Sequence, residues 1–125
     1  MTFDNAVRVN LQKFFTATGR ATRSEFWWYF LLCYVVIGVL GTIGGFVSGH
    51  GGIEQTWVGI VFDVLAAVIG ISVICSQIRR LHDADKSGWN VLWGLIPIIG
   101  QIYLIVLLCK PTYPEANQYG NVPVD

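Results

Sequence analysis

Long runs of apolar residues dominate the pattern of hydrophobic and polar positions in this chain. The first covers 22 residues at 26–47, the second 22 residues at 57–78, and the third 21 residues at 89–109. The first and third runs contain no charged residue, and the second contains only Asp63. At a rise of roughly 1.5 Å per helical residue, each run can cross a hydrocarbon core about 30 Å thick. We therefore predict an all-α integral membrane protein with about three transmembrane helices in a single domain, 1–125.

Shorter polar segments flank these runs. Residues 3–15 place apolar side chains at three- and four-residue steps, which predicts an amphipathic helix within an interfacial segment, 1–19. Such a helix either lies in the membrane interface with its Phe side chains in lipid, which we favour, or packs onto the rest of the protein. The segment 110–125 contains prolines and turn-forming residues, so we expect an irregular tail.

The first run has a start pattern and a glycine-rich end. Thr22–Glu25 reads TRSE, a capping-box pattern that predicts a helix beginning just ahead of the run. Gly38, Gly41, Gly44 and Gly45 then follow within it. They indicate either a face that another helix approaches closely or the place where the helix ends. The sequence leaves both interpretations open.

The third run is interrupted by Pro97, with Gly94 and Gly100 on either side. A proline inside a transmembrane helix can be tolerated as a kink. The same residues can mark the tip of a re-entrant hairpin, whose arms would each cross about half a membrane. We favour one span kinked at Pro97, which puts the C-terminal tail on the opposite side from the N-terminus. A hairpin would return the tail to the same side.

The basic residues are distributed unevenly, although the net charge is zero. Four Lys or Arg residues precede the first run and three follow the second, whereas the 48–56 loop contains none. By the positive-inside rule, the N-terminus and the 79–86 loop are cytoplasmic and the 48–56 loop faces outward. A net charge of zero gives no support for binding nucleic acid.

The polar residues are densest between the second and third runs. Arg79 and Arg80 lie at the predicted cytoplasmic interface, where arginines either fix the topology or bind the phosphates of anionic lipids. Asp83 and Asp85 partly neutralise them, which favours internal ion pairs over a strong lipid site. Residues of this segment match no metal motif, and we expect no metal and no cofactor. The candidate residues for an anion or lipid headgroup are Arg79, Arg80, His82, Lys86 and Trp89.

Asp63 is the one ionisable residue inside a predicted span. A carboxylate within the membrane is costly and is a functional candidate by default. Ala67 and Gly70 follow it at helical spacing, so we expect Asp63 to face protein, with Thr42 of the first run as a hydrogen-bond partner. The alternative is a carboxylate near the outer water.

The sequence contains none of the common enzyme motifs, such as GxSxG, HExxH or a P-loop. We therefore expect a non-enzymatic membrane protein acting through contacts with lipid, including anionic phospholipid headgroups, or with protein, in a homo-oligomer or with another membrane protein. The alternative is a subunit of an oligomeric transporter for a small solute or ion that uses Asp63. An enzyme acting on lipids ranks third, with Arg79, Arg80, His82 and Asp83 as its site.

Four short stretches carry a family resemblance. They read GRATRSEFW at 19–27, RRLHD to SGW at 79–89, LIPIIG at 95–100 and NQYG at 117–120. In this order, over about residues 15 to 123, they resemble the bacterial inner-membrane family called domain of unknown function 805 (DUF805). The resemblance implies a small multi-span protein of the bacterial cytoplasmic membrane and implies no activity. The motif residues are Gly19, Arg20, Arg23, Glu25, Trp27, Asp83, Ser87, Gly88, Asn117, Tyr119 and Gly120.

Overall fold

The computed structural model describes residues 2–50 and 53–123. Regular structure in these residues is helical, apart from one isolated bridge between Asn117 and Gly120. The elements in chain order are α1 (Phe3–Gln12), α2 (Arg23–His50), α3 (Ile53–Asp83), the 3-10 helix η1 (Gly88–Leu95) and α4 (Ile99–Leu108). The predicted all-α fold class is confirmed.

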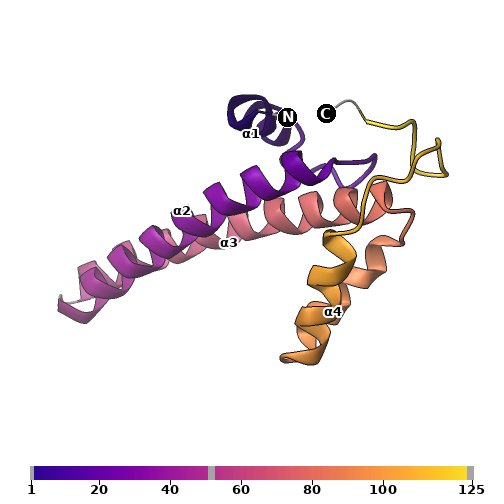
Figure 1. Cartoon of the computed structure of the whole chain (residues 1–125). Helices are drawn as coiled ribbons and strands as arrows, with labels where there is room; N and C mark the ends of the chain where they lie inside the picture. The colour runs from indigo at the N-terminus through magenta and orange to yellow at the C-terminus, as the bar shows by residue number, and fades with distance from the viewer. Residues whose placement is uncertain (1, 51–52, 124–125) are drawn as a thin grey trace.

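Helices α2 and α3 form a long antiparallel pair that runs the length of the molecule (Figure 1). Their segments Arg23–Val47 and Trp57–Asp83 are each long and apolar enough to cross a membrane. Only 11% of the most apolar stretch of each is buried inside the protein, which is the opposite of a soluble core helix. Apolar side chains on all sides are stable where lipid surrounds the helix. The first two predicted spans therefore correspond to α2 and α3.

The predicted 48–56 loop is mostly helical. Helix α2 continues to His50 and α3 begins at Ile53, so only residues 51 and 52 of this loop lie outside the described residues. Of the two interpretations left open for the glycines, the one that ends the helix at Gly44-Gly45 is wrong, because α2 continues through both residues to His50. Gly44 is buried, and a Cβ there would lie 3.1 Å from the Cβ of Phe62 on α3.

Of the glycines predicted to form a close-approach face, Gly44 therefore lies at the contact between α2 and α3, and Gly41 and Gly45 do not. A Cβ on Gly41 or Gly45 would meet no atom within 4 Å. Nearer the other end of the pair, the hydroxyls of Tyr29 and Ser72 are 2.6 Å apart and share a hydrogen bond. This buried bond fixes the register of the two helices.

The third apolar run is a helical hairpin, and our preference for a single kinked span is wrong. Helix η1 leads to a reversal at Ile96–Ile98, and α4 returns beside η1 (Figure 1). Pro97 has no N–H to continue a helix, and Ile98 adopts a positive φ of 65°. A Cβ on Gly100 would collide with the carbonyl oxygen of Trp93, so only glycine allows the arms this close.

The hairpin is too short to carry the chain across a membrane. Helix α4 has 10 residues, or about 15 Å, which is half of a hydrocarbon core. The tail after α4 consequently returns to the N-terminal segment, and the predicted placement of the tail on the opposite side is also wrong. The small apolar core lies at this end, where Phe26, Leu81, Leu104, Leu107 and Leu108 pack together.

The N-terminal helix is packed against the protein, which is the alternative that we did not favour. Ala6 and Asn10 of α1 are fully buried, and the ring of Phe3 meets that of Trp28 edge-on at 5.7 Å. The side chains of Leu11 and Phe15 are exposed. The buried face is small and polar because it covers Ser76 and Arg79 of α3. Contact of the exposed apolar side chains with lipid stays a prediction.

Candidate functional site

Three buried arginines occupy the end of the molecule where all segments meet. The exposed fraction is 5% for Arg20, 1% for Arg79 and 0% for Arg80. Their partners include Glu25 and Asp83, which are also buried, and Asn10 of α1. We call these six residues the arginine cluster. Isolated buried charges cost several kcal/mol each, so every guanidinium here requires partners in good geometry.

Arg79 connects the N-terminal segment to both long helices. Its Nη1 donates to Glu25 Oε1 at 3.1 Å, and its Nη2 donates to Asn10 Oδ1 at 2.7 Å. Its Nε donates to the carbonyl oxygen of Thr16 at 3.1 Å. Ser76 also donates to Asn10 Oδ1, at 3.1 Å. Glu25 reaches this position because its N–H donates to Thr22 Oγ1 at 3.2 Å in the predicted capping arrangement at the start of α2.

Arg80 connects α3 to the end of the hairpin. Its Nη1 donates to Asp83 Oδ2 at 2.8 Å, one helical turn further along α3. Its Nε donates to the carbonyl oxygen of Leu108 at 3.0 Å, and its Nη2 donates to that of Lys110. The Leu108 carbonyl belongs to the last turn of α4, where carbonyls have no partner within the helix, and the Lys110 carbonyl lies just beyond that helix.

Arg20 binds the C-terminal tail. Its Nε donates to Asp83 Oδ1 at 3.1 Å. Its Nη2 donates to the carbonyl oxygen of Tyr113 at 2.7 Å, and its Nη1 donates to that of Glu115 at 2.9 Å. Thr112 of the tail donates to Asp83 Oδ2 at 2.6 Å. Asp83 is therefore the common acceptor for two arginines and the tail.

His82 and the tail motif lie beside this cluster. His82 Nδ1 lies 3.0 Å from the carbonyl oxygen of Gly19, and its ring stacks on that of Tyr119 with centroids 3.8 Å apart. The amide of Asn117 donates to the carbonyl oxygen of His82 at 3.0 Å. Gly120, with φ of 134°, closes the turn by pairing with Asn117. The tail is thus held by specific contacts despite its irregular backbone.

Every nitrogen atom of the three guanidinium groups in the arginine cluster has a hydrogen-bond partner. Three guanidinium groups face two carboxylates, which leaves a formal charge of +1, and carbonyl oxygens and the Asn10 amide oxygen accept further hydrogen bonds from them. Among the described residues, no buried side-chain nitrogen or oxygen atom is without a hydrogen-bond partner. Such a network stabilises the fold only when it is complete, because a half-satisfied buried network is worse than an apolar one.

The structure does not support free guanidinium groups at Arg79 and Arg80 for an anion. Both are buried and engaged by protein atoms, as their partners predict for internal ion pairs. Lys86 is half-buried, whereas Trp89 is 78% exposed. Of the candidate headgroup residues, His82 is half-buried like Lys86, so these two and Trp89 remain accessible, and their contact with lipid stays a prediction. Across the described residues, no three His, Cys, Asp or Glu side chains gather as a metal site would require.

Asp63 also lies elsewhere than expected. Its side chain is on the exposed surface of α3, so the expectation that it faces protein within this chain is wrong. Thr42 is exposed as well and donates to the carbonyl oxygen of Gly38 in its own helix at 2.8 Å. The small residues at 67 and 70 suggested a packed face, but α2 meets α3 at Phe62 and Ser72, through Gly44 and Tyr29.

Most of the motif residues converge on the arginine cluster. Ser87 accepts a hydrogen bond from the Trp89 N–H at 3.3 Å and caps η1. Gly88 packs against α3, since a Cβ there would lie 2.8 Å from Ile78 Cγ2.

Several partners of the arginine cluster were not predicted from the sequence: Asn10, Thr16, Ser76, Thr112 and the carbonyls of the tail. A signal for Asn10 existed, because it interrupts the apolar positions of α1 four residues after Ala6.

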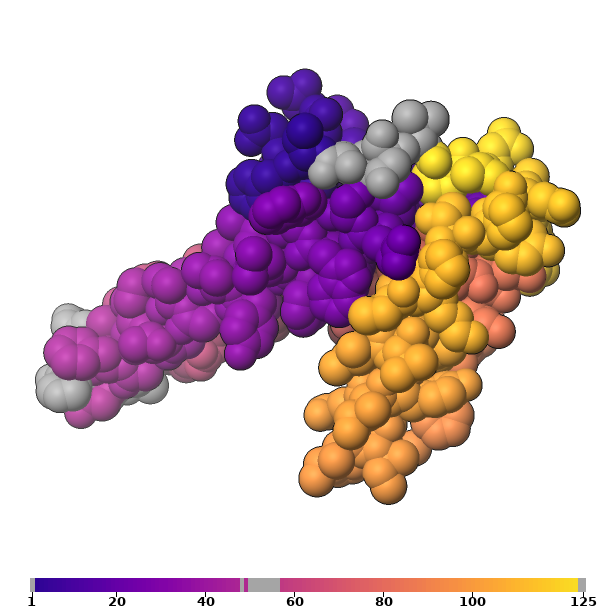
Figure 2. All heavy atoms as spheres, viewed as in Figure 1, coloured from indigo at the N-terminus to yellow at the C-terminus, as the bar shows by residue number. Residues whose placement is uncertain are grey.

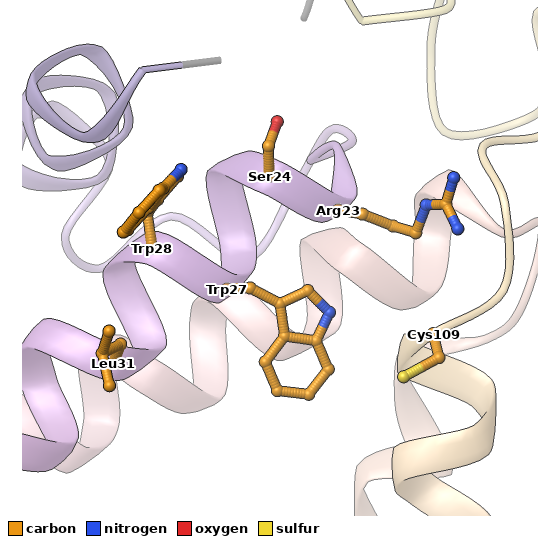
Figure 3. Close-up of a pocket in the computed structure, with 6 residues that line it drawn as sticks. All are labelled: Arg23, Ser24, Trp27, Trp28, Leu31 and Cys109. Carbon is orange, nitrogen blue, oxygen red and sulfur yellow. The ribbon is translucent and has the colours of Figure 1, made fainter.

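Two motif residues, Arg23 and Trp27, face a different feature. A groove of about 540 Å³ opens between the first turns of α2 and the end of α4. Figure 2 shows it as a hollow between these two elements, and Figure 3 shows Trp27 and Cys109 on its sides. The lining residues are Arg23, Ser24, Trp27, Trp28, Leu31 and Cys109.

Comparison with known proteins agrees with the motifs. The family model described as "Protein of unknown function (DUF805)" matches residues 14–121. Inner membrane protein YhaH of Escherichia coli K12 is 32% identical over 105 residues, which are 84% of each chain. Inner membrane protein YhaI of the same organism is 32% identical over 113 residues, which are 90% of each chain. No solved structure matches. The chain therefore belongs to the DUF805 family.

Proposed function

We propose that this chain is a non-enzymatic, multi-pass protein of the bacterial inner membrane that acts by binding anionic phospholipid at its cytoplasmic end. The observation that carries the proposal is the position of the basic residues. None lies between Arg23 and Arg79, and the hairpin brings Lys110 back to the end that holds the others. All eight Lys and Arg residues thus share one end of the molecule.

Three of these eight residues are committed to the arginine cluster. The other five are Arg8, Lys13, Arg23, Lys86 and Lys110, of which only Lys86 is half-buried and the rest are exposed. Basic residues beside an anionic leaflet contribute about 1 kcal/mol each to binding. The five cations therefore suit a surface in contact with anionic headgroups.

The non-enzymatic assignment rests on the hydrogen bonds within the chain that occupy the side chains of the arginine cluster. Each arginine of the cluster donates to carboxylate, amide or carbonyl oxygens of the same chain. Such groups hold segments of the chain together and are buried away from a substrate. Relatives named inner membrane proteins support the location.

The orientation is tested by labelling of single cysteines. The positive-inside rule puts α1 and the tail in the cytoplasm. After removal of native cysteines, Asn5→Cys and Val122→Cys should resist a membrane-impermeant thiol reagent in intact cells, whereas Gly49→Cys should react. Opposite reactivity at positions 5 and 122 would contradict the hairpin, and reaction at both would contradict the orientation.

The lipid function is tested by native mass spectrometry of the protein purified with its lipids. Retained lipid should be enriched in phosphatidylglycerol and cardiolipin over phosphatidylethanolamine. A variant with Gln at the five accessible cations should lose the enrichment while its helix content and melting temperature stay unchanged. Equal retention of anionic and zwitterionic lipid by the unmodified protein would refute the proposal.

Asp63 supports a second candidate, an oligomeric transporter. Its carboxylate is exposed on α3 about 9 Å from Trp57, where the apolar run begins. A pathway would then lie between copies of the chain. Proton or cation flux in reconstituted vesicles that is abolished by Asp63→Asn would favour transport, and the absence of any flux in the unmodified protein would exclude it.

A further inference from the structure

The groove between α2 and α4 combines a charged edge with an apolar interior. Arg23 is exposed at the first residue of α2, and Ser24 follows it. One turn further along the helix, Trp27 is half-buried, and Leu31 beyond it is 53% exposed. Cys109 faces them from the end of α4 (Figure 3). A ligand lying along this groove would meet a cation first and apolar groups afterwards.

The groove exists because the two hairpins separate beyond a shared core. The core residues Phe26, Leu104 and Leu107 hold α4 to α2 and α3 at the cytoplasmic end. Beyond this contact the α2–α3 pair and the η1–α4 hairpin diverge (Figure 1). Trp27 is braced against the core, with its ring centroid 4.9 Å from that of Phe26. The interior of the groove is therefore preformed.

We propose that this groove binds one anionic phospholipid, with the phosphate at Arg23 and an acyl chain along Trp27, Leu31 and Cys109. The inference rests on the proposed function and names a site for it. Charge complementarity decides the occupant, because a guanidinium binds phosphate bidentately and the remaining lining accepts hydrocarbon. A volume of about 540 Å³ holds a headgroup and the first part of a chain.

The position of Arg23 in the sequence agrees with this assignment. It is the last basic residue before the apolar run of α2, which places its guanidinium at headgroup level. Arg20, only three residues earlier, is buried in the arginine cluster. The two neighbouring arginines thus have different roles, one internal and one facing lipid.

The test compares retention of phosphatidylglycerol in mixed vesicles of phosphatidylglycerol and phosphatidylcholine, followed by native mass spectrometry. Arg23→Gln should lower the retained phosphatidylglycerol about fivefold, and Arg23→Lys should preserve most of it. Cys109→Trp keeps every charge but fills the groove, and it should lower retention as well. Arg8→Gln measures the general contribution of an exposed arginine outside the groove, and it should lower retention less than Arg23→Gln because Arg8 does not contact the phosphate bound in the groove.

The outcomes separate the site from the function. If the unmodified protein prefers phosphatidylglycerol but Arg23→Gln and Cys109→Trp do not differ from it, the groove is not the site, although lipid binding stands. If Arg23→Gln and Arg8→Gln lower retention equally while Cys109→Trp has no effect, only surface charge attracts lipid, and the site is refuted. If the unmodified protein shows no preference, the site and the proposed function both fail. Melting temperatures in lipid-free detergent establish that each variant is folded.

Discussion

Replacement of Asp83 by Asn should destabilise the protein severely. The carboxylate accepts from Arg20 Nε at 3.1 Å, Arg80 Nη1 at 2.8 Å and Thr112 Oγ1 at 2.6 Å, and it is fully buried. Asn has nearly the same shape but no charge, and its NH₂ group would face a guanidinium donor. The formal charge of the cluster would rise from +1 to +2.

The size of this effect follows from the burial of both partners. Breaking a buried ion pair by removing one member costs about 3–5 kcal/mol, because the other charge is left uncompensated. We expect Asp83→Asn to lower the free energy of unfolding by about this amount in a denaturant titration in detergent micelles, followed by circular dichroism. The tail should also become sensitive to protease, because Thr112 and Arg20 both hold it through Asp83.

A matched control lies two residues away. Asp85 is exposed and has a positive φ of 59°, which Asn tolerates well. Asp85→Asn should therefore change the free energy of unfolding by no more than about 0.5 kcal/mol. If the Asp83→Asn and Asp85→Asn variants prove equally stable and equally resistant to protease, the cluster does not hold the fold together.

Further changes probe the other contacts. Arg79→Lys should lower the free energy of unfolding by about 1–3 kcal/mol in the same titration, because an ammonium group cannot reach the three partners that the planar guanidinium reaches. Stability equal to that of the unmodified protein would mean that charge alone matters. Gly100→Ala should open the hairpin and lower the melting temperature, because the added methyl collides with η1. Gly41→Ala is the control, since a methyl there meets no atom within 4 Å and should leave the melting temperature unchanged. Equal melting temperatures of the two variants would contradict the close approach of the hairpin arms. Asn10→Ala should lower the free energy of unfolding by about 1–3 kcal/mol, because it removes a buried acceptor. Asn5→Ala is the control, since Asn5 is exposed and its loss should change little. Equal losses for the two variants would place Asn10 at the surface.

The long spans could be predicted from the sequence because they depend on local composition. Runs of 22 apolar residues have few alternatives to a transmembrane helix, and α2 and α3 cover both of them. The helix ends were predicted less well, since α2 continues through Gly44 and Gly45. The fit of Gly44 against Phe62 favours continuation of α2 at this point, and this contact between two helices cannot be read from the local sequence.

The interpretation of the third run determined where the C-terminal tail was placed. Pro97 with two flanking glycines is compatible with a kink or a reversal, and the outcome depends on Gly100 fitting against the backbone near Trp93. Treating the run as a span sent the tail to the opposite side. The carbonyl of Lys110 was then not foreseen as a partner of Arg80, nor were those of Tyr113 and Glu115 as partners of Arg20. The internal ion pairs favoured by Asp83 follow directly once the tail returns.

The position of the arginine cluster explains why arginine is suited to this end of the protein. The hairpin ends at Leu108, where backbone carbonyls have no partner within the helix, and Arg80 donates to the carbonyls of Leu108 and Lys110. A guanidinium offers several N–H donors in a fixed plane, so Arg80 can bind Asp83 and both carbonyls together. Arg20 does the same for the tail. The residues of the family motifs therefore do more than fix topology: they supply the hydrogen bonds that allow a short hairpin and an irregular tail to end beside a membrane.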